Sequence, residues 1–206
     1  MNNFKFIRIN PKYMEDKYKY EDELTGIIFE DLFNIKIKYL DPVYINFYKR
    51  EYLDNRWEKI LTLIYYQNHF KDNYFYIDHD TVINPKILNE NSINATFGPY
   101  GLSDNKLIAS FIDLKIINKY KEIICKNKFI LKDINNEEIL LKRFVFENKK
   151  LNIFKLPMNQ IHNLTFQMHY KTNFIYRLII QNEKIKNKKY LLKLVKNLRR
   201  LYEKKR

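Results

Sequence analysis

The most compact group of side chains able to do chemistry is Asp78-His79-Asp80, in which two carboxylates flank an imidazole. Carboxylates ligate divalent cations, and a histidine or carboxylate can act as a general base. No further histidine or carboxylate follows at a spacing typical of metal ligands. The sequence therefore favours a strand end or a loop at this tripeptide over a metal or base site.

Other reactive residue types are sparse. Cys125 is the single cysteine, which excludes a disulfide framework and a cysteine-built zinc site and favours a buried thiol. His162 and His169 are seven residues apart, whereas metal pairs on helices sit three or four apart, so we interpret them as polar or RNA-facing groups. The three glycines form neither a dinucleotide-binding nor a P-loop pattern. We therefore expect no enzymatic activity, no cofactor, no metal and no small-molecule substrate.

Basic residues are concentrated in the second half of the chain. The net charge is +14, but residues 1–100 contribute −2 and residues 101–206 contribute +16. Each phosphate that such a surface neutralises releases a condensed counterion, so nucleic acid is the favoured partner. An acidic protein, a membrane surface, or no partner at all remain as alternatives. No apolar run approaches the roughly 20 residues that cross a bilayer, so we expect no integral membrane segment.

The first 95 residues combine strand and helix patterns. Phe4–Ile9 and Ile35–Tyr39 alternate apolar and basic residues, which predicts half-buried strands. Glu21–Phe33 and Trp57–Tyr66 place apolar residues on one helical face. The polar segment Asn89–Asn94 indicates a linker. The fold class expected here is mixed α+β.

The second half is predicted to be mainly α. The sharp turn Gly98–Gly101 is followed by a helix with Ser103 as N-cap and an apolar stripe that ends at Ile112. Further helices are expected over Asn135–Phe146, over Met158–His169 and over Lys188–Lys205. The last of these repeats Leu191, Leu194, Val195, Leu198, Leu201 and Tyr202 and is otherwise rich in lysine and arginine, so we interpret it as an amphipathic basic helix.

Three segments of the second half resemble the small-subunit ribosomal protein thirteen family, in conserved order along the chain. Tyr100–Ser103 resembles the Tyr-Gly-Ile-Gly turn of the family, with Ser103 in place of its second glycine. Lys132–Ile139 resembles a Lys-Asp-Leu-x-x-Glu-Glu-Leu helix start. The third match is an Ile-x-x-Leu pattern followed by Tyr-Arg, represented by Ile161, Leu164, Tyr170 and Lys171.

The resemblance implies a helix-two-turn-helix domain followed by a basic extension with an amphipathic helix. It divides the chain into a mixed extension at 1–95, an RNA-binding domain at 96–170 and a basic extension at 171–206. It also implies a structural constituent of the small ribosomal subunit, with small-subunit rRNA, neighbouring head proteins and tRNA as partners. The RNA-binding candidates are Lys171, Arg177, Lys184, Lys186, Lys188, Lys189, Arg199, Arg200, Ser103 and Tyr170.

A second hypothesis is an RNA-free interaction subunit that docks through the aromatic residues of the first half. The abundance of Ile, Asn, Lys, Tyr and Phe, whose codons are A/T-rich, is typical of organelle, parasite or reduced bacterial genomes. We therefore expect a mitochondrial protein encoded in the organelle itself.

Overall fold

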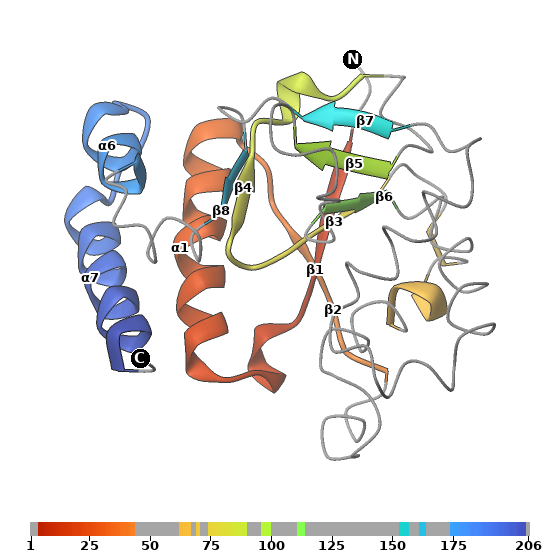
Figure 1. Ribbon diagram of the computed structural model, residues 1–206, viewed down its shortest axis with the longest axis horizontal. Helices are drawn as coiled ribbons and strands as arrows, with labels where there is room; N and C mark the ends of the chain where they lie inside the picture. The colour runs from red at the N-terminus through yellow and green to blue at the C-terminus, as the bar shows by residue number, and fades with distance from the viewer. Residues whose placement is uncertain are drawn as a thin grey trace.

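A computed structural model describes residues 4–43, 62–66, 69–70, 74–89, 96–99, 111–113, 153–156, 161–163 and 174–204. These residues form three layers (Figure 1). The long helix α1 lies between a β-sheet on one side and the helix pair α6 and α7 on the other. The fold is thus an α/β arrangement in which α1 is covered on two faces.

The larger sheet has the strand order β2-β1-β3-β6. Strand β1 (Lys5–Ile9) pairs in parallel with both β2 (Lys38–Leu40) and β3 (Tyr74–Ile77), and β3 pairs antiparallel with β6 (Phe111–Asp113). Residues 6–9 of β1 are all buried, as expected for a central strand covered on both faces.

Two smaller pairings complete the described strands. Strand β4 (Thr81–Ile83) pairs antiparallel with β8 (Ile161–Asn163), and β5 (Thr96–Pro99) pairs in parallel with β7 (Ile153–Leu156). Short 3-10 helices at Pro11–Tyr13 (η1) and Pro85–Ile87 (η4) each begin after an asparagine whose side chain accepts a backbone N–H.

Helix α1 (Asp16–Phe33) begins after η1 and runs beside the sheet. It ends at Asn34, which has a left-handed conformation (φ 55°) that asparagine tolerates better than most residues. The N–H of Asn34 bonds to the carbonyl of Glu30, and the N–H of Ile35 bonds to that of Phe29. This pattern caps the carbonyls that the last helical turn leaves free.

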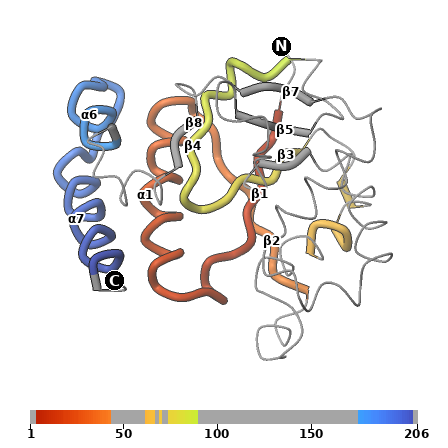
Figure 2. Tube along the Cα trace, viewed as in Figure 1, coloured from red at the N-terminus to blue at the C-terminus, as the bar shows by residue number. Residues whose placement is uncertain are grey.

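Helix α7 (Lys188–Lys204) packs antiparallel on α1, while the shorter α6 (Phe174–Gln181) packs on α7. The Cα trace shows the two long helices side by side (Figure 2). Tyr202 near the end of α7 bonds to Glu21 near the start of α1, and the N–H of Lys186 bonds to Asp31 near the end of α1. The apolar stripe of α7 joins one core with α1 and the sheet.

Several local predictions are confirmed by these elements. The strand at Phe4–Ile9 corresponds to β1, the helix at Glu21–Phe33 to α1, which begins five residues earlier, and the basic C-terminal helix to α7. The strand expected at 35–39 is displaced to β2. Residues 62–66 of the expected helix at 57–66 are helical, and the helix expected at 135–146 lies outside the described residues.

Three segments differ from their prediction. The helix expected after Ser103, whose apolar stripe ends at Ile112, is replaced at Phe111–Asp113 by β6. The helix expected over 158–169 is replaced at Ile161–Asn163 by β8, and Gly98, expected in a sharp turn, lies in β5. Each is a run of three or four residues that pairs with a distant strand, and such pairing overrides a weak local helical pattern. His162 thus lies opposite Val82 in a strand pair and not on a helix face.

The sheet also includes strands from both sides of residue 95, since β6 pairs with β3. The domain boundary expected there does not coincide with a break in the sheet. No helix within the described ranges is long and apolar enough to cross a bilayer.

Candidate functional site at the carboxyl edge of the sheet

The carboxyl ends of β1 and β3 meet where the order of the parallel strands reverses. The chain passes from β1 through α1 to β2 on one side of β1, and β3 lies on its other side. In open α/β sheets, ligands bind outside the carboxyl ends of the strands at such a reversal. Asn10 follows β1 and Asp78 follows β3, so these segments border the expected binding position.

The turn after β3 presents two carboxylates at this edge. The N–H of Thr81 bonds to the carbonyl of Asp78 at 3.1 Å, which closes the turn around His79 and Asp80. The hydroxyl of Tyr76 donates to Asp78 Oδ1 at 2.6 Å, and that of Thr81 donates to Asp80 Oδ1 at 3.0 Å. Both aspartates are only partly buried, unlike the histidine between them.

His79 points into the protein and fixes the turn to β1. Its side chain is 4% exposed, and its Nε2 lies 2.7 Å from the carbonyl oxygen of Ile9. Burial, followed by the nearby positive charge of Arg8, lowers the pKa of His79. The imidazole is therefore neutral near pH 7, and the carbonyl of Ile9 requires the proton on Nε2. His79 thus acts as an anchor for the turn.

Arg8 stabilises the same turn by hydrogen bonds from the interior of the protein. It is fully buried, and its Nη1 donates to Asp22 Oδ1 at 3.0 Å and to Thr25 Oγ1 at 2.7 Å. Its Nη2 donates to the carbonyl of Thr81 at 3.1 Å, and Thr25 Oγ1 donates to the carbonyl of His79 at 2.7 Å. A buried cation needs a paired anion and hydrogen bonds. This network provides them for both terminal nitrogens of Arg8, whereas its buried Nε has no hydrogen-bond partner among the described residues.

A further acidic residue near this turn lies on α1. Glu21 is 1% exposed, accepts a hydrogen bond from the Tyr202 hydroxyl and lies 3.6 Å from Lys17 Nζ. Burial, then the negative charge of Asp80, raises the pKa of Glu21 to about 7. Burial also raises the pKa of Tyr18, and the carboxylates of this region, Asp78 and Asp80 among them, add to the effect. The negative charge of Asp80 therefore acts on both Tyr18 and Glu21.

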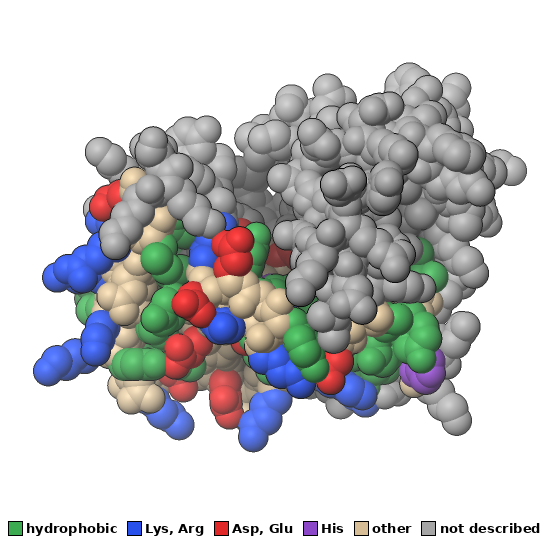
Figure 3. Space-filling model, turned by 90° about the horizontal axis from the view of Figure 1, so that it is seen from below, with side chains coloured by type: hydrophobic (Ala, Val, Ile, Leu, Met, Phe, Trp, Pro, Cys, Tyr) green, Lys and Arg blue, Asp and Glu red, His purple; other side chains and the backbone are tan. Residues whose placement is uncertain are grey.

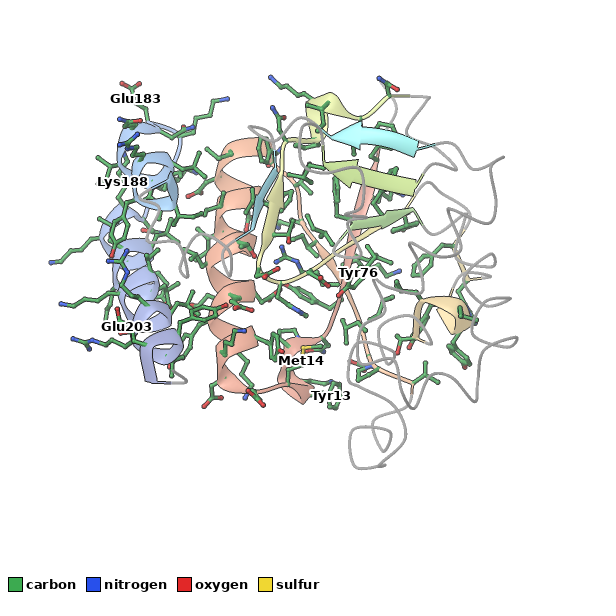
Figure 4. The ribbon with its side chains drawn as sticks, in the orientation of Figure 1. Tyr13, Met14, Tyr76, Glu183, Lys188 and Glu203 are labelled. Carbon is green, nitrogen blue, oxygen red and sulfur yellow. The ribbon has the colours of Figure 1, made fainter. Side chains whose placement is uncertain are left out.

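Figures 3 and 4 show this end of the molecule. Tyr13 and Met14 lie at the foot of α1, where the chain enters the helix from β1 (Figure 4). Seen from below, the described part of the face carries acidic side chains between basic ones that project outward (Figure 3). No group of three or more His, Cys, Asp or Glu residues within the described part of the chain is arranged to hold a metal ion. Mg²⁺, however, commonly needs only one or two carboxylates when a substrate phosphate completes its coordination.

The predicted RNA-binding residues are distributed over α6, α7 and their connection. Arg177, Lys184, Lys186, Lys189 and Arg200 are exposed. Two others have contacts within the protein: Lys188 Nζ donates to the carbonyl of Ile180 at 2.7 Å, and the Arg199 guanidinium lies 5.6 Å from the Tyr176 ring centroid. Ser103, Tyr170 and Lys171 lie outside the described residues. RNA binding by these residues stays a prediction.

The sequence did not indicate the residues that support the Asp78-His79-Asp80 turn, which we call the carboxylate turn. The alternation of apolar and basic residues in β1 predicts that Arg8 lies on the exposed face of the strand, but this residue is fully buried. Asp22 and Thr25 lie 14 and 17 residues from it in the chain, and no spacing rule joins them. The aspartates themselves were visible as Asp78-His79-Asp80. The signal that could have ranked them higher is their position after an apolar strand.

Comparisons with known proteins return one distant structural similarity. No family model and no curated protein matches the sequence. The chain resembles the crystal structure of a glycosyltransferase involved in the glycosylation of the major capsid of PBCV-1, with a TM-score of 0.48 and 10% identity. The alignment covers 74% of this chain and 81% of that chain. Similarity at this level assigns neither a substrate nor an activity to this protein.

Two expectations are nevertheless contradicted. The sequence led us to expect a ribosomal protein without enzymatic activity, whereas the structure that this chain resembles is a glycosyltransferase. The segments at 111–113 and 161–163, expected in helices of the RNA-binding domain, are strands. These strands do not fit the expected helix-two-turn-helix domain, so the ribosomal assignment is corrected, and the exclusion of an enzyme that accompanied it is withdrawn.

Proposed function

We propose that this protein binds a divalent cation, and through it a phosphate-bearing ligand, at the carboxyl edge of β1 and β3. Asp78 and Asp80 supply the carboxylates. The observation that supports this proposal is the position of the Asp78-His79-Asp80 turn at the reversal of a parallel sheet. This position is where α/β sheets bind ligands for reasons of topology.

The support of the turn fits a binding role. A cation site needs carboxylates whose positions are fixed before the ligand arrives, since ordering them on binding lowers affinity. His79 bonds to β1, while Arg8 and Thr25 bond to the carbonyls of Thr81 and His79. The backbone between the two aspartates is thus fixed from inside the protein, and their partly exposed carboxylates remain at the surface.

The chemistry that follows is stabilisation of negative charge on phosphate oxygens. A divalent cation between two carboxylates and a phosphate acts as a Lewis acid and orients the phosphate group. Such a site suits transfer reactions in which a phosphate or diphosphate departs with its bonding electrons. The negative charges of Asp78 and Asp80 repel a phosphate when no cation lies between them.

The direct test is Mn²⁺ binding measured by calorimetry and by water-proton relaxation, first with Mn²⁺ alone and then with inorganic pyrophosphate. We expect Asp78→Asn with Asp80→Asn to weaken Mn²⁺ binding at least tenfold, and pyrophosphate to tighten binding only to the unsubstituted protein. Asparagine retains an amide oxygen that can accept the bonds from Tyr76 and Thr81.

The matched control is Glu30→Gln with Glu183→Gln, which removes two negative charges from exposed positions away from this edge. It should bind Mn²⁺ as the unsubstituted protein does. Equal affinity in the aspartate variant, or no binding at millimolar Mn²⁺, would refute the proposed site.

A further inference from the structure

The exposed face of α7 carries a row of basic residues, which we call the stripe. It consists of Lys189, Lys193, Lys196 and Arg200, all exposed and spaced by four, three and four residues. This spacing places the four side chains along one face of a helix. The opposite face is buried and comprises Leu191, Leu194, Val195, Leu198 and Tyr202.

The segment that carries the stripe has a large excess of positive charge. Residues 174–204 contain ten basic residues and two acidic ones, Glu183 and Glu203. These two lie toward opposite ends of the α6–α7 pair (Figure 4). None of the ion pairs among the described residues includes a member of the stripe.

The dimensions of the stripe suit a linear polyanion. At about 1.5 Å per residue, the four charges are separated by about 6, 4.5 and 6 Å and extend over about 16 Å. One nucleic-acid strand presents a phosphate about every 3.4 Å along a duplex, so the stripe faces about five phosphates. Arg200 also borders a shallow groove lined by Tyr20, Asn197, Leu201 and Glu203.

We propose that this stripe binds the phosphodiester backbone of a nucleic acid. The site is separate from the carboxylate turn and does not depend on the cation-binding proposal. A membrane is the less suitable partner, because an interfacial helix inserts its apolar face into the lipid. In α7 that face is occupied by the contact with α1, and Leu191, Val195 and Leu198 are fully buried there.

The test is fluorescence anisotropy with labelled single-stranded RNA and DNA of about 20 nucleotides, titrated in salt from about 50 to 300 mM. The variant is Lys189→Gln, Lys193→Gln and Lys196→Gln together. Because this variant can neutralise three fewer phosphates, the slope of log affinity against log salt should fall by about 2, and affinity at 0.1 M salt should fall about 100-fold.

The control replaces Lys19, Lys36 and Lys86 by glutamine. These lysines are also exposed, so the same net charge is removed outside α7. It should lose much less affinity than the stripe variant. Circular dichroism and thermal unfolding of both variants establish that each is folded, as expected for exposed positions.

Three results would overturn the proposal. Equal losses in the stripe and control variants would show that net charge alone drives binding. Absence of RNA and DNA binding at low salt would exclude the partner class. Stripe-dependent binding to vesicles with about 30% phosphatidylserine, without comparable nucleic-acid binding, would assign the stripe to a lipid surface.

Discussion

Glu21 provides the most direct test of the electrostatics near the Asp78-His79-Asp80 turn. The change is Glu21→Gln, which removes the ionisable group but retains an oxygen to accept the Tyr202 hydroxyl. Burial and the charge of Asp80 raise the pKa of Glu21 from 4.5 to about 7. The folded protein therefore retains a proton on Glu21 at pH values where the unfolded chain has lost it.

The sign of the effect follows from this difference. A raised pKa stabilises the folded state fully below pH 4.5, and this contribution is lost as the pH rises through about 7. At about 1.4 kcal/mol per pH unit, the contribution is about 3 kcal/mol. The free energy of unfolding of the unsubstituted protein should fall by this order between pH 5 and about 8, and that of the glutamine variant should lack this decrease.

The assay is urea unfolding of both proteins across that pH range. His79 also titrates, but its lowered pKa acts in the opposite direction, so that stability is lost as the pH falls below 6.5. The difference between the two proteins cancels the contribution of His79 and isolates that of Glu21. Parallel stability curves would refute the assignment of a raised pKa to Glu21.

Two further substitutions test the packing around α1. Gly26→Ala should stabilise the protein by up to about 1 kcal/mol in thermal unfolding, because alanine favours the helix and its methyl group would meet only the Tyr39 hydroxyl, at 3.8 Å; a lower melting temperature would contradict this. Arg8→Met should cost about 3–5 kcal/mol in urea unfolding, because it leaves Asp22 buried without its cation. Adding Asp22→Leu to that variant should recover part of the loss, and no recovery would show that the charge imbalance is not its cause.

The elements that could be predicted are those in which the pattern of apolar and polar residues indicates a helix or a strand. The apolar residues of α7 recur with a helical period, and those of β1 alternate with basic residues, which predicts the strand but not the burial of Arg8. Strands β6 and β8 could not be predicted in this way. Each has three residues, and its partner strand lies far away in the chain. A run this short carries too little periodicity to separate a strand from a helix.

The candidate site, like the fold, could be predicted from the sequence only in part. The carboxylates of Asp78 and Asp80 are adjacent enough to be noticed in the sequence, and the basic character of α7 was equally visible. What the sequence could not show is the framework that gives them a role. The bond from Arg8 to Thr81 joins residues 73 positions apart, and the strand reversal that defines the edge depends on pairings across the chain.

The bond between Tyr202 and Glu21 spans 181 positions and has a consequence for how the chain folds. Helix α1 completes its apolar contacts only when α7 has been synthesised and has closed over it. Until then, the outward face of α1 is open to other chains, and unfinished chains with such faces aggregate readily. A nascent polypeptide of this protein should therefore be a good substrate for chaperones, and it should gain resistance to proteolysis late, after residue 202 becomes available.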